Sequence, residues 1–559
     1  MTGVQTCALP IFSLSARIDS FGRRQALALG YAGVVLVYVI TRLLLVWRFP
    51  VHVDEATFAT WTLNGRTYGD TALFQALANG QQPLLEWLGV AWMHAGVEPV
   101  TALRLVSFIA GGLTLAVVAV FATRIYSAPI GLLAAALYAI MPFTLLYSVL
   151  GLYDPLATAF IAAAMLLQYE LARKPRLDLA LLLGFAFSGA VLTKLTAYSA
   201  LYLVPVSALI FDWRRAGLPR RLAVWVGGLA AAFFMAWIAS RIIQLSEFAN
   251  DLSKSREVLA KNSLGTVLND PGYWISRNWP PYRNGIHVYM TAPLVVAAAV
   301  GVALLLKHRW RVGAYLSVWI VVPLGGLVLL AQIPYSRWLV IIAPPLIIVA
   351  AGGLVETIRW IGSLARPSRG RWLVVVAAVV AVLPALVFDA RLLASPTQQP
   401  LPGDDDEAYI TGYPAGTPWK AVGAELRRLS VGRKLVVAAA PNCCGYLPLV
   451  IRHDPAISLL QIEATDIPGA LYAIDNGTAL PPRASGLSWR RSWTYTRPRH
   501  GLPVNLYQSG VVINLKFAGS PDELRAGIGG TDADYDAYLR AHPAVKAWVD
   551  SWYATNPTG

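Results

Sequence analysis

The sequence is short of charged residues, which make up 14% of its 559 residues, whereas soluble domains contain about 25%. It has three cysteines, too few for a disulfide-stabilised framework. Uncharged stretches such as 222–240 and 312–331 are long enough to cross a bilayer as helices. These features exclude a soluble globular protein and predict an α-helical polytopic membrane protein.

The net charge of +15 is confined to one part of the chain. The first 394 residues contain 31 basic and 16 acidic residues, and the remaining 165 contain 15 of each. An excess of Lys and Arg in the membrane part is typical of loops retained on the cytoplasmic side. Nucleic-acid binding would need a basic face with stacking aromatic residues, which the neutral C-terminal part lacks. We therefore expect membrane lipids as partners and no nucleic acid.

Apolar stretches separated by basic loops predict about eleven membrane spans. They lie near 26–47, 101–123, 130–149, 155–172, 178–193, 196–211, 222–243, 289–306, 312–331, 338–358 and 372–390. Basic residues recur in every second loop, as at Arg124 and Arg173. This alternation predicts a multi-pass protein of the cell membrane, taken here as a bacterial inner membrane. Its N-terminus is then cytoplasmic, and everything after residue 390 is periplasmic or extracellular.

The composition changes after Ser395, and residues 395–559 are predicted to form an external soluble α/β domain. Strands are expected at 434–440, 471–474, 493–496 and 504–507, and helices at 419–429 and 532–553. The acidic run 404–407 is interpreted as a solvated linker, because adjacent carboxylates lack the spaced ligands of a calcium loop. Residues 12–394 are left as the transmembrane domain.

Residues 1–11, MTGVQTCALPI, resemble read-through of a short-read sequencing adapter. We exclude them, with Cys7, from structural interpretation and expect the true start codon elsewhere. Cys443 and Cys444 are adjacent, and together with His453 they match no zinc spacing. Two ordinary buried thiols are the simpler interpretation, and a vicinal disulfide is the alternative.

Three carboxylates are candidates for chemistry. Asp54 and Glu55 follow the first span directly, where a carboxylate can act as a general base or a metal ligand; a solvated helix cap is the alternative. Asp154 precedes Pro155 at the start of the fourth span, and helix capping would also explain it. If a divalent metal is bound, Asp54 and Asp154 are its candidate ligands, although nothing in the sequence requires one.

Three cations lie near the same predicted face. Lys194 stands alone in a short turn, Arg337 begins the tenth span beside Tyr335, and Arg104 lies near the external end of the second span. Such cations can bind a phosphate, and together with Tyr335 they are the candidate substrate-binding residues. The alternative is that each side chain extends to lipid headgroups, as interfacial Lys and Arg commonly do.

The order of these motifs resembles that of a known enzyme family. The motifs are Asp54-Glu55, Gln82-Pro83, Ala102-Leu103-Arg104-Leu105, Asp154, Leu192-Thr193-Lys194, Tyr335-Ser336-Arg337 and Ala343-Pro344-Pro345. Over roughly residues 25–390 the chain resembles GT-C fold glycosyltransferases that use polyprenyl-phosphate sugars, and it is similar to protein O-mannosyltransferases and lipid A aminoarabinose transferases. The resemblance does not extend to the C-terminal part.

The resemblance implies a cavity on the external face, a polyprenyl-phosphate sugar donor, and transfer with inversion to an envelope acceptor, whether glycolipid, polysaccharide or protein. It also implies that Asp54 is the base and Asp154 a second active-site carboxylate. Two departures, Thr57 for an Arg and Gln82 for a Lys that aminoarabinose transferases often have, suggest a different headgroup or acceptor. A transporter or flippase of lipid-linked sugars, and a non-catalytic envelope scaffold, are the alternatives.

Overall fold

The computed structural model describes most of the chain. The described ranges are 11–251, 264–363, 367–432, 435–439, 445–451, 454–461, 472–475, 489–509, 521–522, 525, 532–541 and 543–555. Cys7, Cys443, Cys444 and His453 lie outside these ranges, as does the segment 1–11 except for its last residue. The interpretations of these residues therefore stay predictions.

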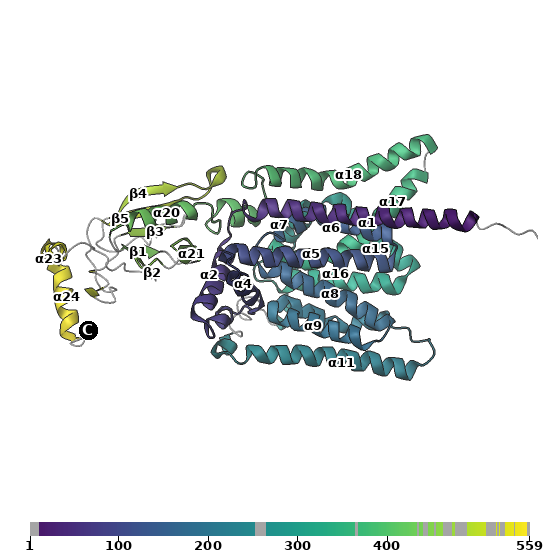
Figure 1. Cartoon of the computed structure of the whole chain (residues 1–559), viewed down its shortest axis with the longest axis horizontal. Coiled ribbons are helices and arrows are strands. Elements are labelled where there is room, and N and C mark those ends of the chain that lie inside the picture. Colours follow the sequence, from purple (N-terminus) through teal and green to yellow (C-terminus); the bar gives the residue numbers. More distant parts are fainter. Residues whose placement is uncertain are drawn as a thin grey trace, which may run out of the picture.

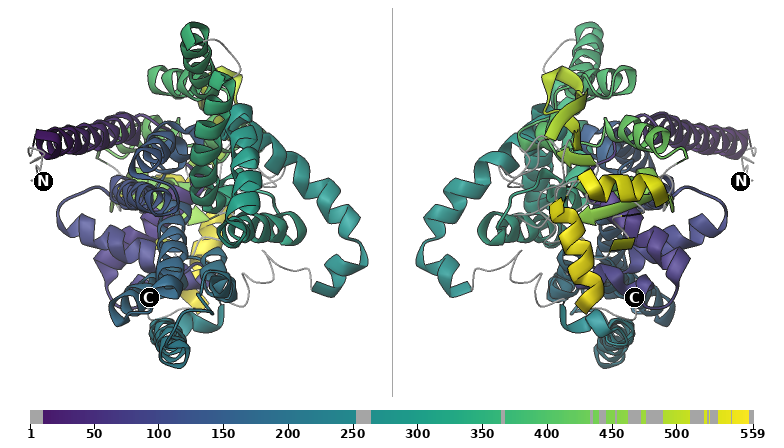
Figure 2. Two further views of the ribbon diagram at one scale, coloured as in Figure 1. Left: turned by 90° about the vertical axis from the view of Figure 1, so that its right-hand side faces the viewer. Right: turned by 90° about the vertical axis from the view of Figure 1, so that its left-hand side faces the viewer.

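Helices form a bundle whose long members run roughly along the length of the molecule (Figure 1). The bundle helices are α1 (Ile11–Val46), α5 (Pro99–Ile125), α6 (Ala128–Ile140), α7 (Pro142–Tyr147), α8 (Tyr153–Arg173), α9 (Leu177–Thr193), α11 (Leu218–Ile243), α15 (Ala292–His308), α16 (Trp310–Leu330), α17 (Ala343–Ser363) and α18 (Pro367–Ala394). Figure 2 shows many of these helices nearly end-on. Their packing buries one extended hydrophobic core.

Shorter elements connect the bundle helices. They are α2 (Val53–Tyr68), η1 (Ala72–Phe74), α3 (Gln75–Ala78), α4 (Leu84–His94), η2 (Leu195–Tyr198), α10 (Ser199–Tyr202), η3 (Val204–Leu209), η4 (Glu247–Asp251), α13 (Leu264–Asn269), α14 (Pro271–Tyr289) and η5 (Ser336–Ile342). Helices α2 and α4 lie at the end of the bundle that faces the C-terminal part (Figure 1). This end carries the candidate site described below.

The expected number of eleven spans is not reproduced. Among the described residues, seven helices are long and apolar enough to cross a membrane, or eight if the bent pair α14 and α15 counts as one span. The remaining predicted spans are shorter or broken. The stretch 130–149 divides into α6 and α7 at Pro142, because proline cannot donate the next helical hydrogen bond. Helix α9 has 17 residues, and 196–211 consists of short turns.

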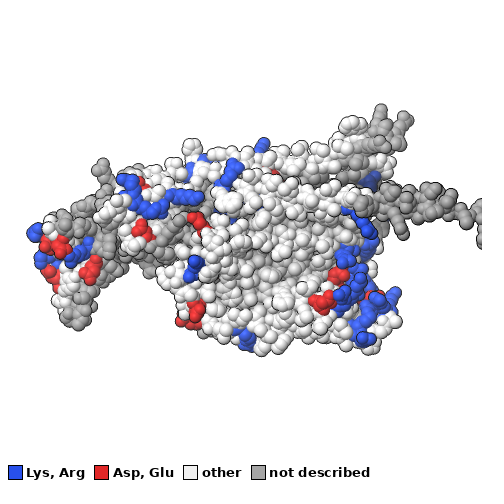
Figure 3. Space-filling view, in the orientation of Figure 1, with Lys and Arg blue, Asp and Glu red and all other residues white. Residues whose placement is uncertain are grey.

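The two ends of the bundle differ in charge. Lys and Arg side chains gather at the end remote from the C-terminal part, and a broad belt without charge covers the middle of the visible face (Figure 3). The loop that joins α8 to α9 and the loop that precedes α11 lie at this basic end (Figure 1). The basic loops that alternate along the sequence therefore converge in space, as expected for one side of a membrane.

The C-terminal part contains a five-stranded sheet in the order β2-β1-β3-β5-β4. Its elements are α19 (Asp404–Asp406), η6 (Glu407–Thr411), α20 (Trp419–Leu429), β1 (Leu435–Ala439), α21 (Leu447–Ile451), β2 (Ile457–Gln461), β3 (Tyr472–Asp475), β4 (Trp489–Tyr495), η8 (Pro498–His500), β5 (Val504–Ser509), α23 (Asp532–Ala541) and α24 (Pro543–Thr555). Strand β1 pairs in parallel with β2 and β3, and β5 pairs antiparallel with β3 and β4. Helix α20 spans the predicted helix 419–429, and strands β1, β3, β4 and β5 overlap the four predicted strands; β2 was not predicted.

The acidic run 404–407 is not a solvated linker, which corrects the interpretation from sequence. Asp405 is buried, and its Oδ2 accepts hydrogen bonds from the hydroxyls of Tyr147 (2.9 Å) and Tyr289 (2.6 Å). Its neighbour Asp404 is exposed. The run therefore fastens the start of the C-terminal part to α7 and α14 of the bundle.

Burial raises the pKa of Asp405 to about 6. An acid whose pKa is raised by folding favours the folded state when protonated, so its contribution is present at about pH 4 and is lost as the pH rises through 6. We expect the free energy of unfolding of the wild type, measured in detergent, to fall relative to that of Asp405→Asn over this range, by on the order of 3 kcal/mol at most. The exposed Asp404→Asn should show no such difference. Parallel curves for the wild type and Asp405→Asn would contradict the assignment.

Candidate active site

A cavity of about 200 Å³ lies where α2, α8 and the turns after α9 and α16 meet. Its lining combines two acidic, two basic, three other polar and three aromatic side chains. These are Asp54, Asp154, Lys194, Arg337, Thr57, Asn79, Gln81, Phe58, Trp61 and Tyr153. The structure thus brings together four of the residues singled out from sequence, although 283 positions separate Asp54 from Arg337.

Helix α2 presents Asp54 through a defined N-terminal cap. His52 is the capping residue: its Nδ1 accepts a hydrogen bond from the backbone N–H of Asp54 (3.2 Å). In return, the Glu55 carboxylate accepts from the His52 N–H (3.0 Å), which completes a capping box. Burial lowers the pKa of His52 to about 4, so its ring is neutral at pH 7 and Nδ1 can accept. Asp54 therefore lies in the first turn of a fixed helix.

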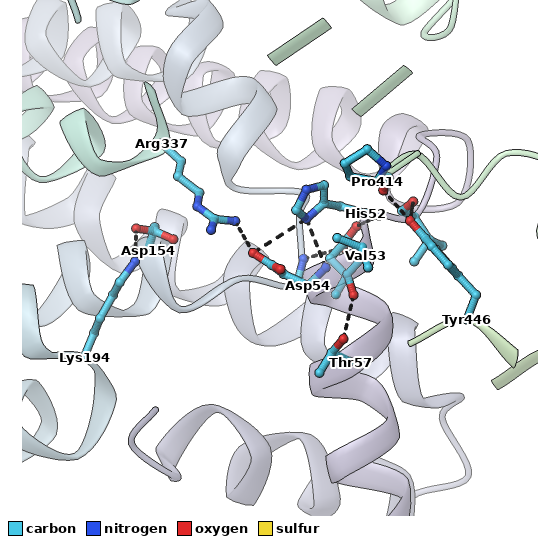
Figure 4. Close-up of polar contacts among 12 residues, drawn as sticks. His52, Val53, Asp54, Thr57, Asp154, Lys194, Arg337, Pro414 and Tyr446 are labelled. Carbon is cyan, nitrogen blue, oxygen red and sulfur yellow. Dashed lines mark hydrogen bonds and ion pairs between the residues drawn. The ribbon is translucent and has the colours of Figure 1, made fainter. Parts of the chain in front are cut away.

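Each carboxylate in the cavity faces one of the two cations (Figure 4). Arg337 Nη1 lies 2.7 Å from Asp54 Oδ2, and Lys194 Nζ lies 2.6 Å from Asp154 Oδ1. The Asp54 side chain keeps 33% of its surface exposed, whereas Asp154 keeps 4%. Of the two carboxylates, Asp54 is therefore the one that a molecule entering the cavity can reach.

The pKa of Asp54 reflects two opposing effects. Burial is the largest single effect and by itself would raise the pKa. The charge and hydrogen bond of the adjacent Arg337 guanidinium, together with His52 and Lys194, outweigh burial and hold the pKa below its ordinary value. Asp54 is therefore ionised at neutral pH and can accept a hydrogen bond or a proton.

Aromatic rings support both cations. The Arg337 guanidinium lies 4.6 Å from the centre of the Tyr335 ring, and Lys194 Nζ lies 5.8 Å from the centre of the Trp338 ring. Tyr335 does not line the cavity itself. Its contact with Arg337 can orient the guanidinium, and the substrate-binding role expected of Tyr335 stays a prediction.

Glu55 and Arg104 lie behind the cavity and do not line it. Both are buried, and Arg104 Nε and Nη2 each donate to one carboxylate oxygen of Glu55 at 2.8 Å. The remaining Arg104 donors reach the carbonyls of Val46, Phe49 and Pro50, and Glu55 Oε1 also accepts from the Gly151 N–H. Both charged groups are thus fully engaged in contacts within the protein. We therefore propose that Glu55 and Arg104 hold the chain before α2 in place. This replaces the catalytic role expected of Glu55 and the substrate-binding role expected of Arg104.

Several lining residues escaped the sequence analysis. Phe58 and Trp61 follow Asp54 by four and seven positions, the spacing of one helix face, and this pattern could have indicated them. Tyr153 gave no such signal: it lies beside Asp154 and donates a short hydrogen bond to Glu86 of α4. Burial raises the pKa of Glu86 to about 8, so this carboxyl is mostly protonated at neutral pH.

The donor set does not fit a divalent metal. Asp54 and Asp154 each already pair with a cation, and Lys194 and Arg337 would repel a metal placed between them. No group of three or more His, Cys, Asp or Glu side chains within the described part of the chain is arranged to hold a metal ion. We therefore assign no step of the chemistry to a metal.

Comparison with known proteins identifies similar folds. Residues 81–239 match the family model described as dolichyl-phosphate-mannose-protein mannosyltransferase. The chain is similar to ArnT from Cupriavidus metallidurans in the apo state, with a TM-score of 0.56 and 14% identity over 88% of this chain and 98% of ArnT. For ArnT bound to undecaprenyl phosphate the TM-score is 0.51, with 15% identity over 87% and 98%. No curated protein sequence matches the chain.

The two comparisons support each other although they differ in kind. The family model matches part of the chain by sequence, and the structural likeness covers nearly all of it at an identity that speaks for the fold alone. The resemblance predicted from motif order is confirmed: the chain has the GT-C fold and is similar to the lipid-phosphate-dependent glycosyltransferases that share it.

Proposed function

We propose that the chain is a membrane glycosyltransferase that moves a sugar from a polyprenyl-phosphate donor to an envelope acceptor, with inversion. One observation carries this proposal: a single cavity contains an accessible carboxylate, Asp54, and two cations, Lys194 and Arg337. A carboxylate can take the acceptor proton, and cations can stabilise a departing phosphate. The match to a mannosyltransferase family model and the undecaprenyl phosphate bound by ArnT support the donor class.

The proposed reaction needs one base and no acid. The acceptor hydroxyl oxygen bonds to the anomeric carbon as the bond from that carbon to the phosphate oxygen breaks, and the hydroxyl proton passes to Asp54. The lipid phosphate leaves as an anion without protonation. Attack from the face opposite the phosphate inverts the anomeric configuration. A hydrolase would usually need a paired acid and base across the bond.

Donor binding would also change the partner of Asp54. Arg337 pairs with Asp54 at 2.7 Å, and a lipid phosphate entering the cavity competes for the same guanidinium, which binds phosphate through a two-pronged fork. Release from Arg337 raises the pKa of Asp54 and makes the carboxylate a stronger base. The base is then strongest when a donor is present.

We propose that the end of the bundle that carries the cavity faces outward. The opposite end carries the dense group of Lys and Arg (Figure 3), which is typical of the cytoplasmic side. The N-terminus is then cytoplasmic, and residues 395–559 lie outside the membrane.

A transporter of lipid-linked sugars is the main rival. Transporters place functional charges near the middle of the membrane, whereas this cavity lies at one end of the bundle, beside α2.

Sugar transfer by the purified protein decides between a glycosyltransferase and a transporter. Mass spectrometry should identify a sugar-modified envelope glycolipid or glycoprotein that is lost in a deletion strain, and the purified protein should restore it from lipid-phosphate donor extracts. Movement of donor across a bilayer without transfer would favour the transporter.

The affinity for the lipid phosphate should depend on Lys194 and Arg337. A hydrogen bond to a charged group contributes about 1.5 to 3 kcal/mol, so Lys194→Gln and Arg337→Gln should each weaken binding of undecaprenyl phosphate by roughly 10- to 100-fold. Lys420→Gln changes an exposed lysine of α20 and controls for the lost charge. Unchanged affinity in both cavity variants would contradict the proposed phosphate site.

A further inference from the structure

The segment that carries Asp54 pairs with the C-terminal part of the chain. The Val53 N–H donates to the Pro414 carbonyl (2.9 Å), and the Gly416 N–H donates to the Val51 carbonyl (2.7 Å). Between them, His52 and Ala415 form an antiparallel bridge. The backbone directly before Asp54 is thus bound to a segment more than 350 positions away (Figure 4).

Side chains reinforce this junction. Ala56 of α2 belongs to the same hydrophobic cluster as Trp419, Tyr446 and the buried residues of β1, and Val51 and Val53 pack against that cluster. The Tyr446 hydroxyl donates to the Pro414 carbonyl, and its ring stacks on Trp419 with centres 5.0 Å apart. The core of the C-terminal part therefore includes the start of α2.

Two glycines allow the close approach. A Cβ on Gly416 would lie 2.5 Å from the Val51 carbonyl oxygen, and a Cβ on Gly445 would lie 2.8 Å from Thr57 Oγ1. At Gly416 the obstructing atom belongs to the backbone, so a side chain fits there only if the two segments separate. At Gly445 the Thr57 side chain would have to shift. Thr57 lines the cavity, so the contact at Gly445 reaches a residue of the site.

The C-terminal part is itself fastened to the bundle close to this junction. Asp405 accepts hydrogen bonds from Tyr147 and Tyr289, and the ring of Tyr409 lies 4.8 Å from the ring of His52, the residue that caps α2. Residues 404–416 therefore contact both the bundle and the residue that caps α2. Asp54 lies in the first turn of that helix.

We infer that the C-terminal part of the chain holds Asp54 in its catalytic orientation, with residues 414–416 and Tyr446 as positioning residues. Arg104 and Glu55 hold the preceding segment from the bundle side, and the bridge at Ala415 holds it from the other side. A displacement of about 1 Å at a reacting group can cost on the order of 10²-fold in rate. This inference rests on the proposed function, because it assigns the C-terminal part a role in that reaction.

The test uses Gly416→Ala in the full-length protein. Lys194 and Arg337 belong to the bundle, so binding of undecaprenyl phosphate should stay within about a factor of two of the wild type while kcat falls roughly tenfold or more. Tyr446→Phe, a milder change that removes only the hydroxyl, should lower kcat in the same direction with binding again retained.

Gly423→Ala is the matched control. A Cβ at Gly423 would lie 2.7 Å from Val450 Cβ, inside the packing of α20 on α21, and its three nearest atoms all belong to Val450 and none to α2. It should disturb the C-terminal part to a similar degree, judged by the unfolding midpoint, while kcat stays near the wild-type value.

The outcomes separate the inference from the proposed function. A wild-type protein that transfers no sugar would contradict the proposed function. Wild-type transfer with unchanged kcat in both Gly416→Ala and Tyr446→Phe would overturn the inference. Equal losses of kcat in Gly416→Ala and Gly423→Ala would also overturn it, as would a loss of lipid-phosphate binding as large as the loss of kcat. A fall in kcat confined to the junction variants, with binding retained, would support it.

Discussion

Asp54→Asn should lower the rate of sugar transfer by about 10² to 10⁴-fold, the typical effect of losing a general base. Asparagine keeps the shape of the side chain and can still accept from Arg337, but it cannot take the acceptor proton. Asp54 is also the more exposed of the two carboxylates in the cavity. Because a general base acts in the chemical step, the defect should appear in kcat. Single-turnover transfer by the purified protein, with its native donor, measures this directly.

The control is a carboxylate with an ion pair but no access to the cavity. Asp178 pairs with Arg176 at 2.6 Å on the surface, and Asp178→Asn should keep nearly full activity. Binding of undecaprenyl phosphate to Asp54→Asn should be retained, because the phosphate is assigned to the cations. Turnover close to the wild type would remove Asp54 as the base.

Breaking the pair of Glu55 and Arg104 should destabilise the protein by about 3 to 5 kcal/mol, as expected when one member of a buried ion pair is removed. Arg104→Met keeps the length and apolar body of the side chain, but it leaves the fully buried Glu55 carboxylate without a counter-ion. It also leaves the carbonyls of Val46, Phe49 and Pro50 without a donor. The unfolding midpoint and the yield of folded protein in detergent measure the loss.

A surface pair gives the comparison. In the pair of Arg176 and Asp178 the two side chains keep 63% and 55% of their surface exposed, and exposed pairs contribute about 0 to 1 kcal/mol. Arg176→Met should therefore change stability little. Equal effects of Arg104→Met and Arg176→Met would argue against a structural role for the buried pair. A Glu55→Gln variant that folds normally but transfers no sugar would restore the catalytic role expected from the sequence.

Composition identified this chain as a membrane protein, because long uncharged stretches are typical of helices that span a membrane. Eight of the eleven predicted spans correspond to long helices or to the bent pair α14 and α15. The predictions that differ concern short stretches such as 196–211. Hydropathy reports apolar character there but does not reveal where proline and local turns end a helix.

The four charged residues that line the candidate site were predictable from sequence, but the ion pairs that they form were not. Asp54, Asp154, Lys194 and Arg337 were each singled out by charge at a predicted helix end, and all four line one cavity. Sequence adjacency made Glu55 look equivalent to Asp54. In a helix, however, neighbouring residues point in directions about 100° apart, so one carboxylate enters the cavity and the other turns inward to Arg104.

The sequence alone determined the membrane class, the convergence of basic loops at one end and the residue types available for chemistry, because these depend on composition and on spacing along the chain. Only the tertiary structure decided which charges meet. The pairing of Arg337 with Asp54, the burial of Asp405 between two tyrosines and the bridge from His52 to Ala415 all join segments more than 100 positions apart. Such contacts depend on how helices and strands pack, which no local pattern specifies.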